Sequence, residues 1–169
     1  MRSPDPHLLV AYGVMKTILA PIDLSDAAAG VTSEARALAE ILGGKVLLLH
    51  VVPPPVVINE YSPEAERLAD EEQQSAEKSL EYWSQNLKNL GVEAEIALRH
   101  GPPVSTILDE AVRIGADYVV MGSHGHGALY NLLVGGTASG VIQKSPCPVV
   151  IVPTQKAVAH AAASHQRTT

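Results

Sequence analysis

Short, largely apolar runs alternate along this chain with longer segments whose apolar residues recur every three or four positions. The short runs are typical of strands buried on both faces, and the longer spacing is typical of amphipathic helices. One run differs, because its larger apolar residues alternate with Glu93, Glu95 and Ala97, as in a strand at the edge of a sheet. The predicted strands cover 17–20, 46–52, 92–98, 118–121 and 149–152, and the predicted helices cover 28–42, 63–90, 103–114 and 137–144.

Residues that favour helix ends stand at these boundaries. Ser25 is a candidate N-cap for the first helix, and Ser62-Pro63-Glu64 combines a cap, an N1 proline and a first-turn acid. Gly91 and Gly115 follow the second and third helices, where glycine commonly ends a helix. The acidic residues between 64 and 72 are expected to form a solvated helix face.

The alternation of strands and helices predicts an α/β fold with a doubly wound, five-stranded parallel sheet and helices on both faces. The strand at 92–98 suits one edge and the strand at 149–152 suits the other, which gives the spatial order 3-2-1-4-5. The first and fourth strands then flank the switch point of a Rossmann-like sheet. Ligands of such folds bind there, beyond the carboxyl ends of the strands.

A chain of 169 residues corresponds to one domain, and we place that domain at residues 15–153. Residues 1–14 are expected to be an N-terminal extension, and Met15 is an alternative start. A secretory signal is a poor interpretation of this extension, because it carries two prolines and an acid and no Ala-x-Ala site follows. Residues 154–169 are expected to be a mobile C-terminal tail.

Composition excludes several classes of function. The 18 acidic residues outnumber the 12 lysines and arginines, and only 4% of the residues are aromatic, so we expect no nucleic-acid partner. No stretch reaches the roughly 18 apolar residues that span a bilayer, so we expect no membrane partner. A single cysteine, Cys147, fits a reducing compartment, and we expect a cytoplasmic protein.

A glycine-dense loop follows the fourth strand. It reads Gly122-Ser123-His124-Gly125-His126-Gly127, and Gly135-Gly136-Thr137 then leads into the last helix. Glycine allows a close approach of the backbone to a ligand, and the unpaired N–H groups of a helix start favour phosphate. Asp23 ends the first strand opposite this loop and is a candidate acceptor for ribose hydroxyls or an amino group. The loop is neither a Walker A sequence nor a dinucleotide fingerprint.

Structural roles compete with these functional ones. The loop could be a simple turn, and Asp23 could cap the first helix in place of Ser25. His124 and His126 are only two candidate ligands, so we expect no metal site. The remaining candidates have mainly structural interpretations: His50 as a hydrogen-bonded core histidine, Cys147 as a packed residue, and Arg99-His100 as solvated residues with phosphate contact as the alternative.

These residues resemble the universal stress protein family. The family motif is Gly-x-x-Gly, nine residues, then Gly-Ser/Thr, and here Gly122-x-x-Gly125 is followed by nine residues and Gly135. Residues 18–25 resemble the first strand and aspartate of the family, and residues 146–152 resemble its terminal strand. The resemblance covers roughly residues 16–153.

The resemblance implies a Rossmann-like fold of the adenine nucleotide alpha hydrolase type that binds ATP or another adenine nucleotide, with Mg²⁺ as an optional companion. It assigns adenosine to Asp23 and to the backbone near Val51, and phosphates to the glycines. One residue departs from the motif, because Gly136 replaces the Ser/Thr hydroxyl, and Thr137 is a candidate replacement. The expected nucleotide-binding residues are Pro21, Ile22, Asp23, Val51, Met121, Gly122, Ser123, His124, Gly125, His126, Gly127, Gly135, Gly136 and Thr137.

The expected function is therefore a stress-response regulator or interaction protein that binds a nucleotide without strong catalysis. A nucleotide-independent dimeric module and a slow ATPase are the alternatives, and the second is disfavoured because the sequence offers no clear general base. The apolar edge strand Val149, Val150, Ile151 and Val152 predicts pairing with its copy in a homodimer, which the resemblance also implies. The identity of a protein partner is left open.

Overall fold

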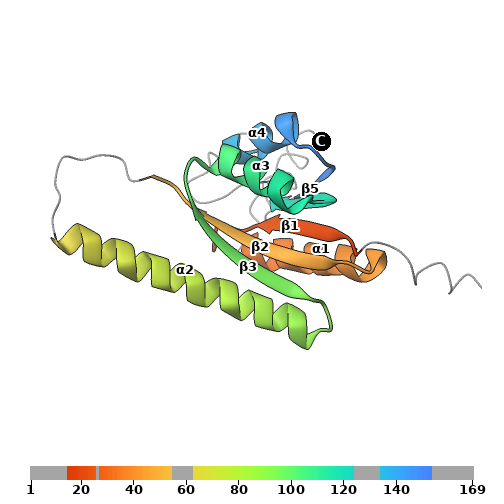
Figure 1. Cartoon of the computed structure of the whole chain (residues 1–169), viewed down its shortest axis with the longest axis horizontal. Coiled ribbons are helices and arrows are strands. Elements are labelled where there is room, and N and C mark those ends of the chain that lie inside the picture. Colours follow the sequence, from red (N-terminus) through yellow and green to blue (C-terminus); the bar gives the residue numbers. More distant parts are fainter. Residues whose placement is uncertain (1–14, 26, 55–62, 124–133, 154–169) are drawn as a thin grey trace, which may run out of the picture.

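Five parallel strands form one sheet in the computed structural model, which describes residues 15–25, 27–54, 63–123 and 134–153 (Figure 1). Their spatial order is β3-β2-β1-β4-β5, so the predicted doubly wound sheet and its order are confirmed. The strands are β1 (Thr17–Pro21), β2 (Lys45–Val52), β3 (Ala94–His100), β4 (Tyr118–Gly122) and β5 (Val149–Val152), and the helices are α1 (Ala27–Leu42), α2 (Pro63–Asn89), α3 (Pro103–Ile114) and α4 (Gly136–Lys144).

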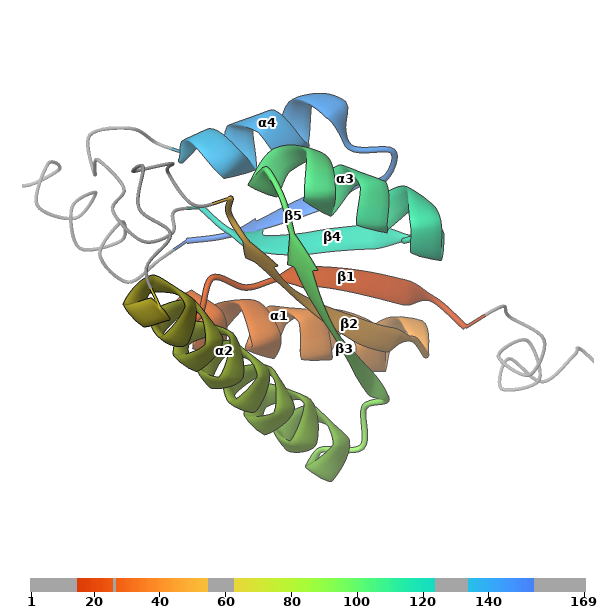
Figure 2. The same ribbon diagram turned by 60° about the vertical axis from the view of Figure 1, so that its left-hand side comes forward.

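The helices cover the sheet in pairs, with α1 and α2 on one face and α3 and α4 on the other (Figure 2). Successive side chains of a strand point to opposite faces, so each strand contributes to two cores. Ile18 packs with α1 and α2, whereas its neighbour Leu19 packs with α3 and α4. Cys147 is half-buried against the second of these cores, as expected for a packed residue.

The edge strand β3 begins and ends two residues later than the predicted strand at 92–98. The amide of Val92 donates to the carbonyl of Leu87 at 3.0 Å, so Val92 belongs to the turn that follows α2. At the other end, β2 runs to Val52 and pairs with His100, which extends β3. The predicted edge position is confirmed, and Glu95 and Ile96 are exposed there.

Helix α2 extends well beyond the sheet (Figure 1). Every residue from 64 to 75 is exposed, and burial begins only at Ala76, Leu80 and Leu87. The acidic start of this helix is therefore solvated, as predicted. Within the described ranges, none of the helices is both long enough and apolar enough to cross a membrane.

Candidate functional site

The carboxyl ends of β1, β2 and β4 and the start of α4 surround a cavity of about 450 Å³. This position is the switch point of the sheet, because β1 leads on to β2 on one side and pairs with β4 on the other. The volume lies within the range of about 300–1,000 Å³ that is common for small-molecule pockets.

The structure brings ten of the expected nucleotide-binding residues together around this cavity. The other four, 124–127, lie outside the described residues. The ten that line the cavity are Pro21, Ile22, Asp23, Val51, Met121, Gly122, Ser123, Gly135, Gly136 and Thr137.

Asp23 stands at the entry to α1 and lines the cavity. Its Oδ1 accepts hydrogen bonds from the amide of Ser25 at 3.1 Å and from the Ser25 hydroxyl at 2.7 Å. Ser25 Oγ in turn accepts from the amide of Ala27 at 3.2 Å, so Ser25 is the cap, as predicted, and Asp23 orients it. Between them, Leu24 adopts φ 62°, an uncommon conformation for a residue with a side chain.

The beginning of α4 is tied to the ends of β4 and β5. The amide of Ser123 donates to the carbonyl of Val152 at 2.8 Å, and the amide of Gly135 donates to the carbonyl of Ser123 at 2.7 Å. Gly135 is the N-cap residue, and none of the described side chains caps this helix. The first turn of α4 therefore presents backbone donors and its positive dipole end at the cavity wall, where an anion is favoured.

Gly136 is exposed in this first turn of α4. A Cβ added to it would meet nothing within 4 Å. The absence of the motif hydroxyl at this position is therefore not imposed by crowding from the described residues.

His50 lies near the end of β2 and also lines the cavity. Its ring is half-buried, and Nδ1 lies 2.8 Å from the carbonyl oxygen of Ile22. Because a carbonyl oxygen only accepts hydrogen bonds, Nδ1 must carry the proton. The predicted hydrogen bond of His50 is thus confirmed, but the predicted place in the core is wrong, because the half-buried ring belongs to a residue that lines the cavity.

The charged side chains among the described lining residues are acidic, namely Asp23 and Glu72, and none is a lysine or arginine. Among the described lining residues, the donors for a phosphate would therefore be uncharged groups, namely backbone amides and hydroxyls such as that of Thr137. The described residues contain no group of three or more histidine, cysteine, aspartate or glutamate side chains suited to a metal ion.

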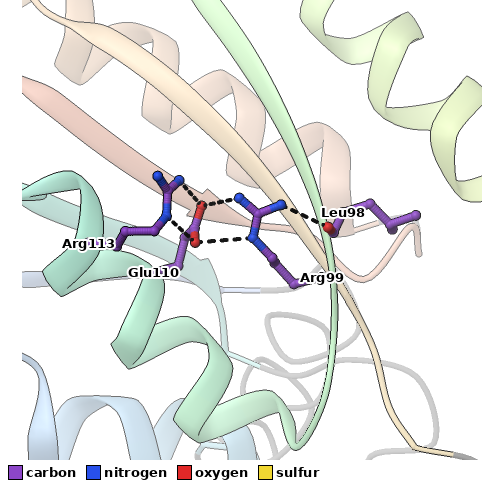
Figure 3. A network of polar contacts seen from close by, with 4 residues as sticks. All are labelled: Leu98, Arg99, Glu110 and Arg113. Atoms are coloured by element: carbon purple, nitrogen blue, oxygen red, sulfur yellow. Dashed lines mark hydrogen bonds and ion pairs between the residues drawn. The ribbon is translucent and has the colours of Figure 1, made fainter.

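Arg99 is neither simply solvated nor directed at the cavity, which corrects both interpretations of this residue. Its guanidinium donates to the Glu110 carboxylate from Nε at 3.3 Å and from Nη2 at 3.1 Å (Figure 3). Arg113 donates to both oxygens of the same carboxylate, which is 4% exposed. The hydrogen bonds from Arg113 and Arg99 hold the pKa of Glu110 below its ordinary value, although burial opposes this.

Comparison with known proteins agrees with this arrangement. The profile of the universal stress protein family matches residues 15–153. The chain belongs to the universal stress protein family. A universal stress protein of Thermus aquaticus is 34% identical over 141 residues, which are 82% of this chain and 99% of that relative.

Solved structures of universal stress proteins share the fold. That of protein MJ0577 of Methanocaldococcus jannaschii is 29% identical, covers 84% of this chain and 99% of its own, and has a TM-score of 0.74. A universal stress protein of Archaeoglobus fulgidus, solved in complex with dAMP, is 23% identical over 82% of this chain and 98% of its own, with a TM-score of 0.60.

The cavity also includes residues that were not predicted from the sequence. Pro53 follows β2, and Pro103 begins α3. Their positions beside the carboxyl edge of the sheet could have identified them. Glu72 could not be found in this way, because it lies on the part of α2 that extends beyond the sheet. Its approach to the cavity depends on the direction of that helix.

Proposed function

We propose that this universal stress protein binds an adenine nucleotide, with ATP as the ligand, at the carboxyl edge of its sheet. The observation that carries the proposal is the convergence of Asp23, the end of β2 at Val51 and the start of α4 on one cavity. The carboxylate and the strand end suit a nucleoside, and the helix start suits phosphates. The dAMP complex of the Archaeoglobus fulgidus protein supports adenine as the base.

Binding, rather than turnover, is the activity that we propose, because the described lining residues include no lysine or arginine that could stabilise a transferring phosphoryl group. The hydrogen bonds of Asp23 Oδ1 to Ser25 and of His50 Nδ1 to Ile22 orient both side chains for a ligand. A Mg²⁺ ion accompanying ATP would take its ligands from phosphates and water, as this ion commonly does. Occupancy of the site would then regulate the surface offered to a partner in the stress response of a cytoplasmic protein.

The proposal is tested first on the protein as purified. Denaturation followed by mass spectrometry of the released small molecules should recover an adenine nucleotide. Calorimetric titration of the stripped protein with ATP, with and without Mg²⁺, should then show saturable binding. Absence of both recovered nucleotide and binding at millimolar ATP would overturn the proposal and favour a nucleotide-independent interaction module.

A further inference from the structure

The ring of His50 is fixed by its attachment to the loop after β1. The amide of Ile22 donates to the carbonyl of Leu49 at 2.8 Å, and the carbonyl of Ile22 accepts from His50 Nδ1 at 2.8 Å. Both hydrogen bonds join the same two segments, β2 and the residue before Asp23. The orientation and the tautomer of the imidazole are therefore set within the cavity wall.

The other ring nitrogen, Nε2, is without a hydrogen bond to the described part of the chain. Every buried side-chain nitrogen or oxygen of the described residues has a hydrogen-bond partner. His50 makes its hydrogen bond through Nδ1, and Nε2 makes none with a described residue, so Nε2 is not buried. His50 is one of the residues that line the cavity, and in a neutral ring with hydrogen on Nδ1 the lone pair is on Nε2.

We propose that His50 is a specificity-determining residue, whose neutral Nε2 accepts a hydrogen bond from a donor group of the bound nucleoside. This inference rests on the proposed nucleotide site and extends it. The donor is the amino group of the base or a hydroxyl of the ribose, because these are the donors that a nucleoside carries. Asp23 and Glu72 also line the cavity and accept hydrogen bonds when ionised, so this wall selects ligands with donors.

Two substitutions distinguish the roles of the two ring nitrogens. His50→Asn keeps an amide donor near the position of Nδ1 for the Ile22 carbonyl but removes the acceptor. His50→Gln carries an amide oxygen far enough out to replace Nε2. With adenosine as the probe, we expect His50→Asn to weaken binding about three- to tenfold, the range for one neutral hydrogen bond. His50→Gln should recover part of this loss.

Control measurements identify the donor group of the ligand. His100→Asn, at an exposed end of β3 outside the cavity, should leave adenosine affinity unchanged. Purine riboside, which lacks the amino group, and the 2′- and 3′-deoxyadenosines should each be titrated against the wild type and His50→Asn. The ligand whose affinity no longer differs between the two proteins has lost the donor that His50 recognises.

Equal adenosine affinity for the wild type, His50→Asn and His50→Gln would overturn this inference and leave the nucleotide site standing. Failure of the wild type to bind both adenosine and ATP would instead overturn the proposed function. Should His50→Asn fail to fold, equal affinity of the wild type for adenosine and for all three analogues would overturn the inference, because no donor of the nucleoside would then be recognised.

Discussion

The amide of Gly135 donates a 2.7 Å hydrogen bond to the carbonyl of Ser123, a residue twelve positions earlier in the chain. The same Ser123 donates from its amide to Val152 at the end of β5. These two backbone hydrogen bonds hold the start of α4 beside the ends of β4 and β5. They place the N-terminus of the helix at the cavity.

Gly136→Ser should restore a phosphate contact at this fixed helix start. The site has room for the new side chain, and the hydroxyl can donate to an anion. A hydrogen bond to a charged group is worth about 1.5–3 kcal/mol, so ATP affinity should rise by roughly ten- to a hundredfold in calorimetric titration. Adenosine is the matched ligand control and should bind equally to both proteins. Unchanged ATP affinity would show that residue 136 does not face the phosphates.

Glu110→Gln should destabilise the fold. The Glu110 carboxylate is 4% exposed and takes hydrogen bonds from Arg99 and Arg113, and a neutral amide can satisfy only part of this set. Both arginines are partly exposed and can rehydrate, so we expect a loss of about 1–3 kcal/mol in urea unfolding. Glu40→Gln disrupts the exposed pair with Arg36 and should cost less than about 1 kcal/mol. Equal losses for the two variants would contradict the role of burial.

Acid stability should depend on the same carboxylate. The hydrogen bonds from Arg113 and Arg99 lower the pKa of folded Glu110, so the unfolded chain takes up this proton at a higher pH than the folded chain. The stabilisation is complete at pH values above the ordinary pKa of glutamate. It is lost as the pH falls through the lowered pKa of folded Glu110. Urea unfolding of the wild type should therefore lose more stability than Glu110→Gln between about pH 5 and 3. Parallel curves for the two proteins would exclude this contribution.

The carboxylate of Asp117 should also stabilise the fold at neutral pH and lose this effect in acid. A hydrogen bond from Lys16 and another from the Thr17 amide hold the pKa of this carboxyl below its ordinary value. These contacts join the start of β1 to the residue before β4. Asp117→Asn should reduce the stability lost in acid, measured in the same titration. An Asp117→Asn curve parallel to that of the wild type would show that this carboxylate does not contribute.

Pairing through β5 would give the homodimer that we predict. β5 lies at an edge of the sheet, hydrogen bonded to β4 among the described strands, and Val150 is 36% exposed. Val150→Lys places a charge on this edge and should shift the light-scattering mass from dimer to monomer at micromolar concentration. Val112→Lys, on an exposed part of α3, is the control and should not change the mass. A monomeric wild type would refute the dimer.

Much of the fold was predictable because the strands are buried on both faces. Uninterrupted apolar sequence is the direct result of that burial, as at Leu47, Leu48 and Leu49. The edge position of β3 was visible for the converse reason, since one face carries Glu93 and Glu95. The boundaries of β3 were less accurate, because the partner strand and the turn after α2 decide where pairing begins.

The site was predictable where it follows strand ends and less so elsewhere. Asp23 and Gly122 occupy positions that the topology alone brings to one edge of the sheet. The partner of Arg99 was not predictable, because Glu110 meets it only after α3 packs across the sheet. The approach of Glu72 to the cavity likewise depends on how far α2 extends.

The exposed half of α2 should change its stability when a ligand binds. From residue 64 to 75 this helix depends on local contacts such as Arg67–Glu71, and an isolated helix of that length is marginal in water. Its amide hydrogens should therefore exchange with solvent far faster than those of the half that covers the sheet. Glu72 borders the cavity, so a ligand that contacts it would stabilise this part of the helix and slow the exchange of its amide hydrogens. Ligand binding would then change the order of a helix that extends beyond the sheet.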